Sequence, residues 1–164
     1  MHDWKLPWDG ACRCGRLKIR VSAPPLIAGA CHCSNCRRMT SSAFSLSAAI
    51  PADGFAVIEG EPVLGGMQGA TRHYFCPHCL SWMFTRPEGL DTLVNVRPTM
   101  FEEAPLLAPF VETYTAEKLP FAQTGAAHSF AALPPMEAWR SLMHEYAACM
   151  ASEVQSPDAK DQAQ

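Results

Sequence analysis

The sequence has 164 residues, of which 48% are hydrophobic, and its formal net charge is −3 at pH 7. This length and composition predict one domain, or one domain with an appendage. Without a basic surplus the chain is not expected to bind nucleic acid, and it has no apolar run of the roughly 18 residues that a membrane span needs. Residues 1–10 do not resemble a secretory signal, so we expect a soluble, cytoplasmic protein.

Short strands separated by turns are predicted over most of the chain. Leu17, Ile19 and Val21 alternate with polar residues, which is the period of a half-buried strand. Ser34 is the predicted N-cap of one helical turn over residues 35–40, and the glycine-rich residues 60–69 are predicted to form a loop. Further strands are expected at residues 26–30, 43–50, 55–59, 71–75, 82–85, 90–96 and 111–115. This pattern predicts a mainly β architecture.

An amphipathic helix is predicted at residues 135–150, after two prolines and with Glu137 in its first turn. Five apolar residues recur along it at helical spacing: Met136, Trp139, Met143, Tyr146 and Met150. We interpret this stripe as a packing surface, used against the β domain of residues 1–133 or against a second subunit of a homodimer. Cys149 is assigned to packing as well. Residues 151–164 are polar and are expected to form a flexible tail.

Seven of the eight cysteines fall into three groups. The groups are Cys12 with Cys14, then Cys31 with Cys33 and Cys36, then Cys76 with Cys79. In a reducing compartment, clustered cysteines favour metal ligation over disulfides. Zinc lies about 2.3 Å from each thiolate sulfur in a tetrahedron, so the sulfurs must lie about 3.8 Å apart. Residues i and i+2 of a flat strand are about 6.6 Å apart, so the C-x-C pairs need a tight turn, and Gly15 can supply a positive φ after Cys14.

Seven thiolates divide naturally into four and three. Two pairs, Cys12 with Cys14 and Cys76 with Cys79, make a closed structural site. The triplet cannot complete a tetrahedron alone. Its fourth position is either open to water or a substrate thiol, as in catalytic zinc sites, or filled by a histidine. The candidate histidines are His32, His73 and His78, whereas His2, His128 and His144 are interpreted as bystanders.

These residues, taken in order, resemble the glutathione-dependent formaldehyde-activating enzyme (Gfa-like) family. The matching motifs are Cys12-x-Cys14-Gly15, Cys31-His32-Cys33-x-x-Cys36-Arg37-Arg38 and Phe75-Cys76-x-x-Cys79. The resemblance extends from about residue 10 to about residue 120. Leu80 departs from the resemblance, because the family usually has glycine directly after the cysteine that corresponds to Cys79. The turn that holds Cys76 and Cys79 is therefore expected to have a different conformation.

The resemblance implies a small β fold of the Mss4-like kind, built from stacked antiparallel sheets. It implies two zinc ions per chain, one structural at Cys12, Cys14, Cys76 and Cys79 and one catalytic at Cys31, Cys33 and Cys36. The implied activity is addition of glutathione to formaldehyde, which is a carbon–sulfur lyase reaction run in reverse. The other hypothesis is a non-catalytic zinc module that binds a protein or a ligand.

The charged pair Arg37 and Arg38 directly follows the triplet. The two guanidinium groups are expected either to pair with the carboxylates of a glutathione-like peptide or to be solvated partners of the thiolates. The sequence leaves both possibilities open.

Overall fold

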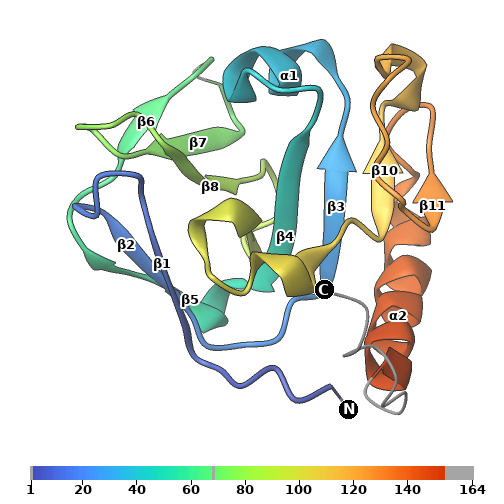
Figure 1. The fold of residues 1–164 in the computed structure, drawn as a ribbon, viewed down its shortest axis with the longest axis horizontal. Helices are drawn as coiled ribbons and strands as arrows, with labels where there is room; N and C mark the ends of the chain where they lie inside the picture. Colours follow the sequence, from blue (N-terminus) through green and yellow to red (C-terminus); the bar gives the residue numbers. More distant parts are fainter. Residues whose placement is uncertain (1, 68, 154–164) are drawn as a thin grey trace, which may run out of the picture.

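The computed structural model describes residues 2–67 and 69–153, which form two β-sheets and two α-helices (Figure 1). The prediction of a mainly β fold is therefore confirmed. The smaller sheet has the order β1-β2-β5, with both pairs antiparallel, and consists of β1 (Trp8–Ala11), β2 (Lys18–Val21) and β5 (Phe55–Glu59). Leu17, Ile19 and Val21 are all at most 1% exposed, as their alternation predicts.

The larger sheet has eight strands in the order β11-β10-β3-β4-β9-β8-β7-β6. In chain order they are β3 (Ile27–Cys31), β4 (Ser45–Pro51), β6 (Val63–Gly65), β7 (Arg72–Phe75), β8 (Trp82–Arg86), β9 (Leu93–Val96), β10 (Val111–Thr113) and β11 (His128–Ser129). Most neighbours are antiparallel, as expected, but β10 pairs parallel to both β3 and β11. Buried residues of both sheets join in one hydrophobic cluster, which includes Trp8 and Ile19 from the small sheet and Ile50 and Val96 from the large one.

The ends of three neighbouring strands, β10, β3 and β4, lie together at one end of the large sheet. Cys31, the last residue of β3, is paired in register with Ser45 at the start of β4 and with Thr113 at the end of β10. The helix α1 (Ser34–Thr40) follows directly and lies above these ends (Figure 1). The fold thus places the middle cysteine group where a strand passes into a helix.

The helix α2 (Met136–Glu153) lies beside β10 and β11 (Figure 1). Leu142, Tyr146 and Met150 are buried in the core, and the Tyr146 ring centroid is 5.5 Å from that of Phe110. Met136 is 66% exposed and so does not share in this packing. No helix of the described residues has the length and apolarity that a membrane span requires. The tail was predicted from residue 151, but α2 continues to Glu153, and the rest of the predicted tail, from residue 154 onward, lies outside the described residues.

Three local predictions were wrong. The expected loop of residues 60–69 contains β6, which hydrogen-bonds to β7 because Gly65 lets the backbone approach the Phe75 ring: a Cβ there would lie 2.6 Å from a ring carbon. The N-cap of α1 is Cys33, whose sulfur accepts from the Cys36 N–H, and Ser34 is already helical. Cys149 is exposed and does not pack against the core.

Candidate metal centre

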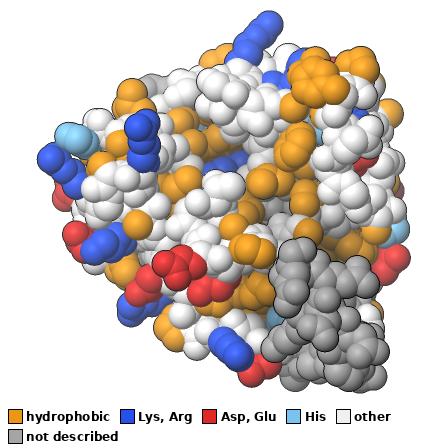
Figure 2. All heavy atoms as spheres, viewed as in Figure 1, with side chains coloured by type: hydrophobic (Ala, Val, Ile, Leu, Met, Phe, Trp, Pro, Cys, Tyr) orange, Lys and Arg blue, Asp and Glu red, His pale blue; other side chains and the backbone are white. Residues whose placement is uncertain are grey.

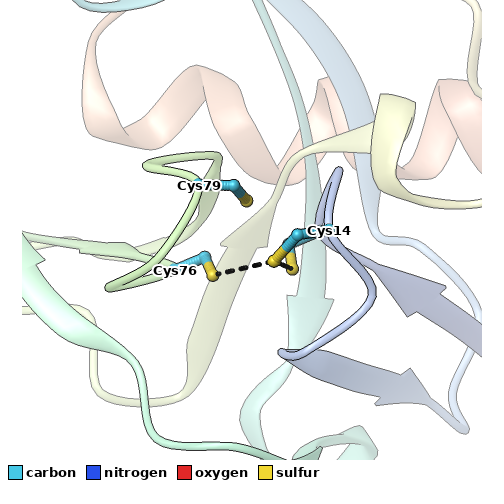
Figure 3. A group of neighbouring side chains, drawn as sticks. Cys14, Cys76 and Cys79 are labelled. Atoms are coloured by element: carbon cyan, nitrogen blue, oxygen red, sulfur yellow. Dashed lines mark hydrogen bonds between the residues drawn. The ribbon is translucent and has the colours of Figure 1, made fainter.

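The four-cysteine cluster joins the two sheets. Cys12 and Cys14 lie in the turn after β1, and Cys76 and Cys79 lie in the turn between β7 and β8. The four sulfurs lie within 4.8 Å of one another, with Cys14 Sγ 3.4 Å from Cys12 Sγ and 3.7 Å from Cys76 Sγ. Figure 3 shows the labelled side chains pointing toward a common centre. These separations and this donor set fit a closed tetrahedral thiolate site.

In both turns of this cluster the N–H of the first cysteine donates to the carbonyl five residues on, but the inner hydrogen bond spans three residues in the first turn and four in the second. The Cys12 N–H donates to Leu17 O (3.0 Å) and the Gly15 N–H to Cys12 O (2.9 Å). In the second turn the Cys76 N–H donates to Ser81 O and the Leu80 N–H to Cys76 O, both at 3.0 Å. Gly15 has φ +76° and Leu80 has φ +58°. Leu80 therefore adopts the left-handed conformation that favours glycine, and its side chain is 70% exposed.

The three-cysteine cluster is built on the β3–α1 junction. Cys31, Cys33 and Cys36 offer sulfurs within 4.8 Å of one another, and all three are half-buried. The Cys36 N–H donates to Cys33 Sγ at 3.3 Å, so the helix start itself orients one sulfur toward the other two. A hydrogen bond with Cys36 lowers the pKa of Cys31, and the same contact, with burial, raises the pKa of Cys36. Thiols that share protons in this way fit a site that exchanges them for a cation.

No histidine completes this cluster among the residues that the structure describes. A fourth ligand within 4.8 Å of all three sulfurs is absent from that part of the chain. His32 is fully buried, and its Nε2 bonds to Glu112 Oε2 at 2.9 Å. His73 Nδ1 bonds to Thr85 Oγ1 at 2.9 Å, and His78 is exposed on the other cluster's turn. The three predicted candidates are thus engaged or directed elsewhere.

Glu112 on β10 is the buried centre of a hydrogen-bond network that includes His32, the residue between Cys31 and Cys33. Its carboxylate accepts from four side chains: Ser129 Oγ (2.6 Å), Thr124 Oγ1 (2.7 Å), Lys118 Nζ (2.9 Å) and His32 Nε2 (2.9 Å). Burial alone would raise the pKa of Glu112, but these hydrogen bonds outweigh it and lower the pKa to about 2. The ionised carboxylate thereby ties the β3–α1 junction to residues 118–129.

Two further side chains lie near the three sulfurs. Arg97 is 7% exposed, and burial lowers its pKa to about 10, although the thiolates of Cys36 and Cys31 act in the opposite direction. Tyr114 has a left-handed backbone with φ +55°. Burial, followed by the charge of the three thiolates, raises the pKa of its phenol. Negative charge on the cluster therefore acts to raise the pKa of both side chains.

A surface cavity of about 440 Å³ lies against α1. Residues that line it include Ser34, Arg37, Arg38, Ser42, Leu119 and Phe121. In Figure 2, Lys and Arg side chains lie beside hydrophobic ones at the top of the molecule, over α1. Arg38 is exposed and Arg37 half-buried, and neither has a carboxylate within 4.0 Å in the described part of the chain. The cavity thus offers two free cations beside an apolar wall.

Comparison with protein families identifies the chain's relatives. The model of the family "Glutathione-dependent formaldehyde-activating enzyme" matches residues 7–117, which is more than half of the chain. The chain belongs to this family. None of the curated proteins matches it. A solved structure of a Rhodobacter sphaeroides protein shares 24% sequence identity, covers 57% of this chain and 87% of its own, and superposes with a TM-score of 0.49.

In this family member, sequence patterns alone did not point to Glu112, Arg97 or Tyr114. A charged residue in the apolar, β-branched segment VETYT was the available signal for Glu112, and an arginine directly after a buried strand was the signal for Arg97. Neither signal names a partner. One partner of each is distant along the chain: His32 for Glu112 and Leu46 for Arg97.

Proposed function

We propose that this protein is a zinc-dependent carbon–sulfur lyase or synthase, which adds a thiol such as glutathione to a small aldehyde such as formaldehyde. Three half-buried sulfurs lie together without a fourth ligand from the described residues, and this open arrangement carries the proposal. Membership of the glutathione-dependent formaldehyde-activating family supports it. A cytoplasmic location is part of the proposal, because it keeps the grouped cysteines reduced.

Two zinc ions per chain are proposed, with different roles. Cys12, Cys14, Cys76 and Cys79 hold a structural ion that joins the two sheets, whereas Cys31, Cys33 and Cys36 hold the catalytic one. Thiolates are suitable ligands for zinc in both clusters. At an open three-thiolate site, zinc supplies Lewis acidity and favours the thiolate form of an approaching thiol.

The reaction itself is an addition without oxidation or reduction. The substrate sulfur forms a bond to the aldehyde carbon, the carbonyl π bond breaks, and the thiol proton goes to the carbonyl oxygen. The product is a hemithioacetal, which for formaldehyde and glutathione is S-hydroxymethylglutathione. The reverse direction breaks the carbon–sulfur bond, which is the lyase reaction.

Arg37 and Arg38 are proposed to bind the carboxylates of the thiol substrate. The two guanidiniums border the cavity of about 440 Å³ and have no acidic partner among the described side chains. A guanidinium binds a carboxylate through two parallel hydrogen bonds. Leu119 and Phe121 line the same cavity and give it an apolar side. A small peptide with free carboxylates and an apolar stem matches this lining.

The test of activity is the exchange between formaldehyde and S-hydroxymethylglutathione at equilibrium, followed by NMR. The zinc-loaded protein should accelerate the exchange, and Cys33→Ser should abolish the acceleration while the fold is retained. Cys76→Ser should instead unfold the protein or make it insoluble, because it opens the site that joins the sheets. No acceleration by zinc-loaded wild type would reject formaldehyde and glutathione as substrates and favour the non-catalytic zinc module.

The role of the arginine pair is tested with two thiols. The double variant Arg37→Met, Arg38→Met should raise the KM for glutathione about tenfold or more, because binding loses at least one charged hydrogen-bonding partner. With 2-mercaptoethanol, which has no carboxylate, the same variant should match wild type. Arg72→Met is the matched control, since Arg72 is an exposed arginine on β7 outside this cavity. An equal loss with both thiols would contradict carboxylate binding.

A further inference from the structure

Arg97 is a buried cation whose own contacts leave its charge uncompensated. Its Nη1 donates to Leu46 O (3.0 Å) and its Nη2 to Thr85 Oγ1 (3.1 Å), and the guanidinium carbon lies 3.7 Å from the centre of the Trp82 ring. These partners are neutral. No carboxylate of the described residues lies within 4.0 Å, and the buried Nε has no hydrogen-bond partner there. No other Lys or Arg in that part of the chain is buried.

A buried charge of this kind needs an opposite charge nearby. Burying an unpaired cation is unfavourable, and a cation–π contact offsets only part of that cost. The Arg97 guanidinium binds Leu46, whose β-bridge partner is Ala30, next to Cys31. The negative groups that act on Arg97 are the sulfurs of Cys36 and Cys31. The three-cysteine cluster, which begins one residue after the strand partner of Leu46, is therefore a source of balancing charge for Arg97.

The net charge of a zinc-loaded three-cysteine site shows what a nearby guanidinium would do. Three thiolates around Zn²⁺ carry a net charge of −1 by simple addition. One guanidinium brings the buried assembly to neutrality. A fourth, neutral ligand would keep that balance, and a thiolate would leave −1 instead of the −2 of an uncompensated site. A buried cation thus lowers the electrostatic cost of an anionic fourth ligand.

We propose that Arg97 is the counter-cation of the three-cysteine site, and that it holds zinc there and favours a thiolate as the exchangeable ligand. This inference rests on the proposed function, since it requires zinc at the triplet. A guanidinium has no lone pair to offer a metal, so Arg97 would act through its charge, as a positioning residue. Its place beside Trp82 and Thr85 fixes the guanidinium, because the ring and the hydroxyl restrict its orientation.

A purely structural role would have a different signature. If Arg97 only fills space over Trp82, replacing it should alter stability and leave zinc affinity unchanged. If it balances thiolate charge, its neutral replacement should leave the metal-free fold as stable as before or more stable, because a buried charge has been removed. Zinc affinity at one site alone would then fall.

The test is a competition for zinc between the protein and a chromophoric chelator. Wild type should release two zinc ions in separable steps, and Cys36→Ser identifies the step that belongs to the triplet. Arg97→Met should weaken that step about 10- to 100-fold, the usual effect of losing a residue behind a metal ligand, and leave the other step unchanged. Arg97→Lys should retain most of the affinity. Arg86→Met is the matched control, because Arg86 also lies over an aromatic ring, 5.9 Å from the centroid of Phe55.

Glutathione adds a second measurement on the same proteins. It should protect the triplet zinc of wild type from the chelator, and protect that of Arg97→Met less. If Arg97→Met does not fold, Arg97→Gln replaces it, and Gln should follow Met while Lys follows wild type. Zinc affinities of Arg97→Met within threefold of wild type, with glutathione protection intact, would overturn the inference and leave the proposed function standing. Release of one zinc only, unaffected by Cys36→Ser, would overturn the proposed function itself.

Discussion

Replacing Glu112 with glutamine keeps the size of the side chain and removes its charge. The buried carboxylate, 7% exposed, accepts from His32, Lys118, Thr124 and Ser129. Glutamine offers one oxygen and an NH₂ group, so at least one of these donors loses its acceptor. We expect Glu112→Gln to destabilise the protein more than any single surface substitution.

The pKa of Glu112 gives the magnitude. A carboxyl pKa that falls from 4.5 to about 2 on folding corresponds to about 3 kcal/mol of stability at neutral pH. Removing one partner of a buried pair costs about 3–5 kcal/mol in general, which agrees. Because the folded pKa lies below the unfolded one, this contribution is complete above about pH 4.5 and is lost as the pH falls toward 2.

The assay is urea unfolding of wild type and Glu112→Gln, measured side by side from pH 7 downward. The difference between the two proteins removes contributions that both share, including that of bound metal. It should be about 3 kcal/mol at pH 7 and shrink steadily below about pH 4.5. Glu59→Gln is the control, because Glu59 forms an exposed pair with Lys18 and should change stability by less than about 1 kcal/mol. A pH-independent difference, or one below about 0.5 kcal/mol at pH 7, would refute the role assigned to this network.

The turns of the four-cysteine cluster and the C-terminal helix supply further predictions. Leu80→Gly should stabilise the protein by up to about 1 kcal/mol in thermal unfolding, because it relieves a left-handed leucine that buries little surface; a loss of stability would contradict this. Gly15→Ala should cost about 1 kcal/mol by the same argument with the sign reversed, although an added Cβ meets nothing within 4 Å. Cys149→Ser should leave the free energy of unfolding within about 0.5 kcal/mol of wild type, since Cys149 is exposed; a larger loss would contradict its exposed position.

Local pattern predicted much of this fold because the strands are short and have simple periods. The Leu17, Ile19, Val21 alternation located β2, and the cysteine spacing grouped the seven sulfurs that the structure brings into two clusters. β1 was missed although Trp8 and Gly10 are buried and alternate with exposed residues. Its four residues are too few to show a period, and the residues that cover Trp8 include the distant Phe101.

The surroundings of the three-cysteine cluster depend on long-range pairing, which sequence patterns do not encode. Glu112 reaches His32 across 80 residues, and Arg97 reaches Leu46 across 51. The parallel pairing of β10 with β3 places Thr113 beside Cys31. The sequence therefore predicted how the seven cysteines group, and left open which histidines and charges would surround them.

The most direct test of the division into one closed and one open site is ¹¹³Cd NMR of the cadmium-substituted protein, because thiolate sites bind cadmium as they bind zinc. Two resonances are expected. Added glutathione should shift one of them, the one that Cys33→Ser removes, and leave the resonance of the Cys12, Cys14, Cys76 and Cys79 site in place. A single resonance, or two that both ignore glutathione, would contradict an open three-cysteine site.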